Sequence, residues 1–123
     1  MGGCMSLSRN VLIVEDEPLI AMMLEDVLDS LGHKVVAMCD TVDAALTRVE
    51  EGGFDLAVLD VHLDGRTSWP VADRLRALGI PFLVASGGSI EAPPAAYANA
   101  PTLAKPYTVD AVPCAIEAAL ATV

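Results

Sequence analysis

The sequence lacks features that would place it in several common functional classes. Hydrophobic residues make up 54% of the chain, yet no apolar run reaches the roughly eighteen residues of a membrane-spanning helix, so we expect no membrane insertion. Only 7 basic residues stand against 17 acidic ones, so the basic patch that nucleic-acid binding requires is missing. The three cysteines form no CxxC pair and no zinc spacing, which indicates reduced thiols in a cytoplasmic protein.

Common enzyme and targeting signatures are also absent. The sequence contains no phosphate-binding P-loop, no dinucleotide glycine motif, no nucleophile elbow and no zinc-protease motif. It has no signal peptide, because the N-terminus lacks a basic flank and a long apolar segment. Residues 1–6 match the short N-myristoylation pattern, but we favour a flexible leader over residues 1–9.

Over residues 10–123, short apolar runs typical of buried strands alternate with segments whose apolar residues recur at helical spacing. This length suits one domain. Short apolar runs predict buried strands at 11–14, 34–38, 54–61, 80–85 and 102–104. Helical spacing predicts helices over 19–31, from 42 to the glycines at 52–53, from 68–70 to 78, and from 108–110 to about 122. The proline-interrupted stretch 89–101 predicts only a short or irregular helix. This order predicts an α/β fold with a parallel sheet covered by helices on both faces.

Some local features follow from single residues. Gly32 is the expected C-cap of the first helix, and Asp40 or Thr41 the N-cap of the second. We expect the methionines, Met22 and Met23 among them, to fill the core, and His33 to lie on the surface.

Polar residues follow four of the five predicted strands. The first strand ends at Glu15 and Asp16, the third at Asp60, the fourth at Ser86, and the fifth just before Lys105. In an open α/β sheet, ligands bind at the carboxyl ends of the strands. These side chains are therefore expected to converge on one crevice.

The residue types in that crevice suit phosphoryl chemistry on a carboxylate. Three carboxylates close together repel one another unless a cation joins them, and Mg²⁺ prefers such oxygen ligands. A carboxylate held between a metal and Lys105 stays ionised and can attack phosphorus. Ser86 can donate a hydrogen bond to a phosphoryl oxygen, and the Gly87 amide can approach closely because glycine has no side chain.

The chain resembles the receiver domains of bacterial two-component response regulators from about residue 10 to the end. The segments that carry the resemblance are Val14-Glu15-Asp16-Glu17, Leu59-Asp60-Val61, Ala85-Ser86-Gly87 and Lys105-Pro106-Tyr107. The resemblance implies a flavodoxin-like (βα)5 fold, doubly wound, with a five-stranded parallel sheet in the order 2-1-3-4-5. The segment from Asp60 to Gly65, followed by Trp69 to Asp73, is similar to stand-alone single-domain receivers.

The resemblance also implies a role for each matching residue. Asp60 corresponds to the phosphorylated aspartate, while Glu15 and Asp16 correspond to the acidic pair that binds Mg²⁺. The backbone carbonyl of His62 corresponds to a further metal ligand. Ser86 matches the switch hydroxyl, and Lys105 matches the family's invariant lysine.

One position departs from the family pattern. The residue three before the lysine is usually aromatic and is Thr102 here, so an aromatic ring cannot rotate inward when the switch operates. We expect signalling to proceed through repacking of residues 86–102 instead. How the switch works without the aromatic is not fixed by the sequence, and neither is the choice between Glu15 and Asp16 as the direct metal ligand.

Three functions compete. The leading one is a phosphoacceptor switch: Asp60 takes a phosphoryl group from a sensor histidine kinase or a histidine phosphotransfer protein, and the domain signals by contact with an unknown downstream protein. Such a chain is no enzyme beyond catalysing its own phosphorylation and dephosphorylation. A phosphatase of the haloacid-dehalogenase type would need an acid where His62 stands, and no cap domain is apparent. A pseudo-receiver scaffold, which binds independently of phosphorylation, stays open because of Thr102.

Overall fold

The structure, a computed structural model, describes residues 9–63, 65–86, 102–104 and 111–121. Several expectations therefore lie outside the described residues. They are the leader apart from Arg9, the irregular stretch 89–101, and the first turn of the last helix.

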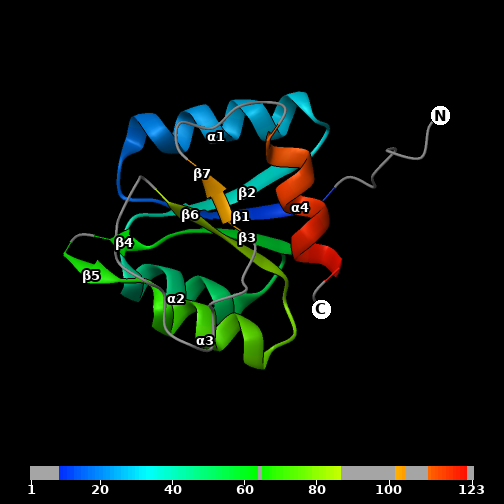
Figure 1. The fold of residues 1–123 in the computed structure, drawn as a ribbon. Helices are drawn as coiled ribbons and strands as arrows, with labels where there is room; N and C mark the ends of the chain where they lie inside the picture. Colours follow the sequence, from blue (N-terminus) through cyan, green and yellow to red (C-terminus); the bar gives the residue numbers. More distant parts are fainter. Residues whose placement is uncertain (1–8, 64, 87–101, 105–110, 122–123) are drawn as a thin grey trace.

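Five parallel strands form one sheet in the order β2-β1-β3-β6-β7 (Figure 1). Counted along the chain, this is the predicted order 2-1-3-4-5. The central strands β1 and β3 are buried on both faces, which explains why their sequences read as continuous apolar runs. The bounds are Asn10–Val14 for β1, Lys34–Cys39 for β2, Leu56–Asp60 for β3, Phe82–Ser86 for β6 and Thr102–Ala104 for β7.

Helices cover both faces of the sheet, as the doubly wound prediction requires. Two apolar clusters fill the space between helices and sheet, and alternate residues of β1 enter them: Val11 and Ile13 on one side, Leu12 and Val14 on the other. The first cluster includes α1 and α4, and the second includes α2 and α3, in the arrangement that Figure 1 shows. No helix among the described residues is long and apolar enough to cross a membrane. The bounds are Pro18–Ser30 for α1, Val42–Glu51 for α2, Trp69–Ala77 for α3 and Ala111–Ala121 for α4.

The helix ends refine the predicted caps. Thr41, and not Asp40, caps α2, because its hydroxyl oxygen accepts a hydrogen bond from the Ala44 amide at 3.1 Å. The C-cap of α1 is Leu31, and Gly32 follows it with a φ of +89°. The glycine therefore lies one position beyond the predicted cap, where the chain needs the left-handed region.

The prediction for His33 is wrong. Its side chain is only 5% exposed, and its Nδ1 atom accepts a hydrogen bond from the Arg9 amide at 3.1 Å. Burial, and then the nearby positive charge of Arg9, lower the pKa of His33. A residue that follows a helix end is expected to face solvent, but His33 packs against Arg9, the residue directly before β1.

The prediction for the methionines on α1 is also wrong. Met22 is 56% exposed and Met23 is 47% exposed, while Ala21, Leu24 and Leu28 form the buried stripe of the helix. The apolar residues of α1 are more numerous than one buried stripe can hold. The surplus lies on the solvent side of the helix.

A short antiparallel hairpin follows β3 and was not predicted. Its strands are β4, His62–Leu63, and β5, Arg66–Thr67, with His62 opposite Thr67 and Leu63 opposite Arg66. Strands of two residues are too short to leave a period in the sequence. The predicted third strand, 54–61, is correspondingly shorter and ends at Asp60.

Candidate functional site

The topology of the sheet brings the predicted acidic residues together. Strands β1 and β3 are neighbours, and Val14 pairs with Leu59. Glu15 and Asp60 each come one residue after that pair, so they lie at the same level, at the carboxyl ends of the two strands. Asp16 follows Glu15 in the connection to α1.

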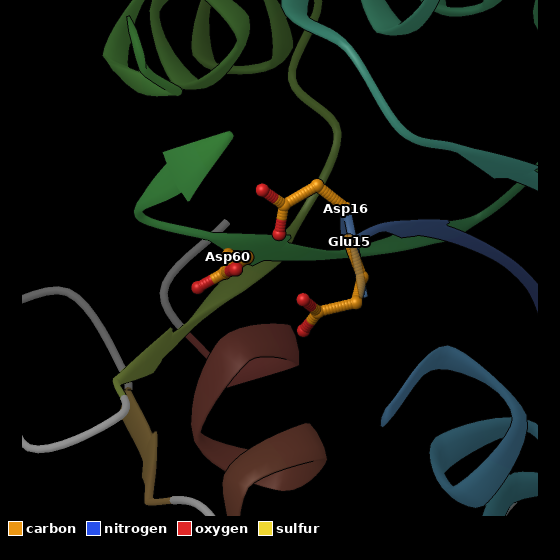
Figure 2. Close-up of side chains that lie close together, drawn as sticks. All are labelled: Glu15, Asp16 and Asp60. Atoms are coloured by element: carbon orange, nitrogen blue, oxygen red, sulfur yellow. The ribbon is translucent and has the colours of Figure 1, made fainter. Parts of the chain in front are cut away.

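The three carboxylates form one cluster (Figure 2). One oxygen from each of Glu15, Asp16 and Asp60 can be chosen so that all lie within 4.8 Å of one another. Glu15 is 4% exposed and Asp60 is 9% exposed, whereas Asp16 is the most accessible of the three. The cluster therefore has a buried floor and an open side. The predicted convergence of Glu15, Asp16 and Asp60 is confirmed in geometry.

Backbone contacts hold Glu15 in this position. Its amide donates to the Cys39 carbonyl at the end of β2, at 2.9 Å. One of its carboxylate oxygens accepts a hydrogen bond from the Glu17 amide at 3.2 Å. Pro18 then starts α1, whose N-terminal amides favour nearby negative charge. The sequence carries no signal for the part played by Cys39, because that contact uses only its backbone.

The donor set fits a divalent cation such as Mg²⁺. All three groups offer carboxylate oxygens, the ligand type that Mg²⁺ prefers. At a metal–oxygen distance of about 2.1 Å, two opposite ligands lie about 4.2 Å apart. Neighbouring ligands of such an octahedral ion lie about 3.0 Å apart, and at most one pair of the three oxygens can be opposite. The three oxygens, which lie within 4.8 Å of one another, would therefore draw closer together around the ion. Glu15, Asp16 and Asp60 are the group that would hold the ion.

The remaining predicted residues are placed less completely. Ser86 ends β6, one residue beyond the pairing of Asp60 with Ala85, so its backbone lies at the same edge of the sheet. His62 begins β4, and its side chain is exposed. Gly87 and Lys105 lie outside the described residues. Their roles, and that of the Ser86 side chain, stay predictions.

Solved structures with the same fold extend over nearly the whole chain. The solution structure of SdrG from Sphingomonas melonis Fr1 is 51% identical, has a TM-score of 0.85, and covers 94% of this chain and 99% of its own. A BeF3-activated conformation of SdrG, from Pseudomonas melonis Fr1, is 52% identical with a TM-score of 0.77 and covers 89% and 93%. The response regulator PhyR from Brucella abortus is 30% identical with a TM-score of 0.78, and covers 97% of this chain and 50% of its own.

A curated relative and a family match point the same way. The virulence sensor protein BvgS from Bordetella pertussis is 37% identical over 71 residues, which are 58% of this chain and 6% of that protein. The chain thus spans only a small part of this relative. Residues 11–113 match the family described as the response regulator receiver domain. That match covers most of the sequence, and the chain belongs to the receiver-domain family of two-component signalling.

Proposed function

We propose that this protein is a phosphoacceptor switch in which Asp60 carries the phosphoryl group. The observation that supports it most directly is the carboxylate cluster of Glu15, Asp16 and Asp60, with oxygens within 4.8 Å at the carboxyl edge of the sheet. Receiver domains are signalling switches rather than enzymes in general. The proposed catalysis is limited to the chain's own phosphorylation and dephosphorylation. The BeF3-activated conformation of SdrG, which is 52% identical, is consistent with this proposal.

The proposed reaction begins at a carboxylate oxygen of Asp60. This oxygen attacks the phosphorus of a phosphohistidine on a sensor kinase or a phosphotransfer protein, the phosphorus–nitrogen bond breaks, and the imidazole leaves. Water later attacks the same phosphorus, and the carboxylate and inorganic phosphate are released. Bound Mg²⁺ would supply charge neutralisation for the transferring group. Glu15, Asp16 and Asp60 would hold the ion, together with the backbone carbonyl of His62.

Three further residues complete the proposed site. The Ser86 hydroxyl donates to a phosphoryl oxygen, the Gly87 amide contacts the same group, and Lys105 offsets its charge. The backbone of Ser86 ends β6 beside the end of β3, which is consistent with this role. Signalling then proceeds by rearrangement of residues 86–102, because Thr102 offers no aromatic ring.

We propose the outer face of α1 as the contact for the phosphodonor protein. The donor's imidazole must reach Asp60, so that protein has to cover the rim of the cluster, where α1 begins two residues after Asp16. Leu19, Met22 and Met23 are 73%, 56% and 47% exposed on this helix. Exposed apolar side chains that lie together mark surfaces for protein contact.

This contact surface has a test of its own. Leu19→Ala combined with Met22→Ala should slow loading by a phosphorylated sensor kinase that loads the unmodified chain. It should leave loading by acetyl phosphate unchanged, because that small molecule needs no protein surface. If the kinase loads the variant and the unmodified chain at equal rates, the outer face of α1 is not the contact for the phosphodonor protein.

The output is proposed to pass through contact with another protein. The net charge of −10 disfavours nucleic acid as a direct partner. Residues 10–123 form the proposed receiver and residues 1–9 a leader, and we place the protein in the cytoplasm, where sensor kinases present their phosphohistidine. A phosphoryl group adds about −1.5 to −2 charges, enough to reorder a neighbouring loop.

The experiment that tests the proposal is intact-mass measurement after incubation with acetyl phosphate. The unmodified chain should gain one phosphoryl group when Mg²⁺ is present and none when the metal is removed. The Asp60→Ala variant should gain none in either case, whereas Glu117→Gln, on the exposed side of α4, should behave like the unmodified chain. No gain with Mg²⁺, and none from a phosphorylated kinase, would favour a pseudo-receiver scaffold that works without phosphorylation.

A further inference from the structure

The β4–β5 hairpin begins directly after the segment that carries Asp60. Gly65 lies directly before β5 and has a φ of +79°. Apart from the two neighbouring residues in the chain, a Cβ atom built on Gly65 would meet no atom within 4 Å. A side chain at this position therefore fits in space, and its cost comes from the backbone conformation alone.

The hairpin is fixed to the rest of the protein at two points. Leu63 is fully buried in the cluster that α2 and α3 cover. Arg66 forms an ion pair with Asp43 in the first turn of α2, with 3.4 Å between guanidinium nitrogen and carboxylate oxygen. That pair is exposed and contributes little by itself. The buried leucine is the main anchor.

The ladder of the hairpin sets the direction of the His62 carbonyl. The Ser68 amide donates to the Val61 carbonyl at 2.8 Å, which places a ladder hydrogen bond between residues 61 and 68. In an antiparallel ladder, bonded and non-bonded pairs alternate. The next pair, His62 with Thr67, is therefore of the non-bonded kind. Its geometry turns the His62 carbonyl away from β5.

We infer that the hairpin is a positioning device for the divalent cation, and that Gly65 is its critical residue. The inference rests on the proposed function, in which the His62 carbonyl binds the ion. The ladder fixes the orientation of this carbonyl, away from β5, before any metal arrives, and the positive φ of Gly65 lets the ladder close. The carboxylates supply the charge of the site, and the hairpin supplies the placement of a neutral oxygen.

The test compares three glycine variants by isothermal titration with Mg²⁺. Gly65→Val places a β-branched residue at positive φ, and its affinity should fall about 5- to 30-fold, the population cost of that conformation. Gly65→Asn should keep most of the affinity, because asparagine tolerates positive φ. Gly79→Val is the matched control: Gly79 has a φ of +73°, lies in open space, and follows α3. It should lower the melting temperature without changing Mg²⁺ affinity.

The possible outcomes separate the two proposals. An unchanged Mg²⁺ affinity in Gly65→Val, or an equal loss in Gly79→Val, overturns the positioning role and leaves the phosphoacceptor function standing. An unmodified chain that binds no Mg²⁺ overturns both. Weaker binding in Gly65→Val, with recovery in Gly65→Asn, supports the hairpin as the device that places the neutral carbonyl ligand.

Discussion

The carboxylate cluster makes a quantitative prediction about stability. In Asp60→Asn, two of the three charge–charge repulsions among Glu15, Asp16 and Asp60 disappear. At 4.8 Å and an effective dielectric constant of 20, each repulsion is about 3.5 kcal/mol. Water reaches Asp16 and screens part of this, so we expect the variant to be about 1–3 kcal/mol more stable than the unmodified chain without metal. That corresponds to a rise of about 3–10 °C in melting temperature for a chain of this size.

Thermal unfolding in a chelator and in excess Mg²⁺ measures this effect. The metal should raise the melting temperature of the unmodified chain, because it binds only the folded state. Mg²⁺ should have much less effect on Asp60→Asn. The difference in melting temperature between the two chains should therefore narrow or reverse when Mg²⁺ is added. Glu117→Gln removes one negative charge from the exposed side of α4 and should follow the unmodified chain. If Asp60→Asn were no more stable in chelator, or kept the full metal effect, the carboxylates would not be repelling one another as proposed.

Three further predictions concern the rest of the fold. The stability of the protein should fall as the pH drops below 6.5, because burial lowers the folded-state pKa of His33 and the unfolded chain takes up the proton first. Urea unfolding midpoints at pH 7.5 and 5.5 measure this loss, and the part of it that His33 causes should vanish in His33→Gln. Thr41→Ala should cost about 1 kcal/mol in urea unfolding, because the α2 cap is lost, whereas Ser68→Ala should cost nothing or stabilise, since the Ser68 hydroxyl is buried without a hydrogen bond. Alkylation at pH 8, followed by peptide mass mapping, should modify Cys114 well before Cys39, because burial raises the pKa of the Cys39 thiol; equal rates would contradict the described burial.

The strands and the carboxylate cluster were predictable because their signals are local. Residues 11–14 and 56–59 are short apolar runs of the kind that strands buried on both faces carry. Once those strands are assigned, the rule that ligands gather at their carboxyl ends brings Glu15, Asp16 and Asp60 together. The order of the sheet came from the family resemblance and not from any single residue.

The features that escaped prediction depend on tertiary contacts. Arg9, the residue directly before β1, contacts His33, and nothing in the residues around position 33 indicates that contact. Met22 and Met23 are exposed because α1 buries one narrow stripe, while hydrophobicity alone assigns both residues to the core. Each strand of the hairpin after Asp60 is only two residues long, which is too short to show an alternation of apolar and polar residues in the sequence.

The pairing of β1 with β3 also has a consequence for biosynthesis. Val11 lies beside Leu56, so the two halves of the acidic cluster come from segments separated by 45 positions, with α1, β2 and α2 between them. Contacts between distant segments form late, because the intervening loop must close first. A growing chain on the ribosome therefore cannot assemble the carboxylate cluster before β3 has emerged and joined β1. Under the proposed function, a partly made chain that lacks this pairing cannot divert phosphoryl groups from finished molecules.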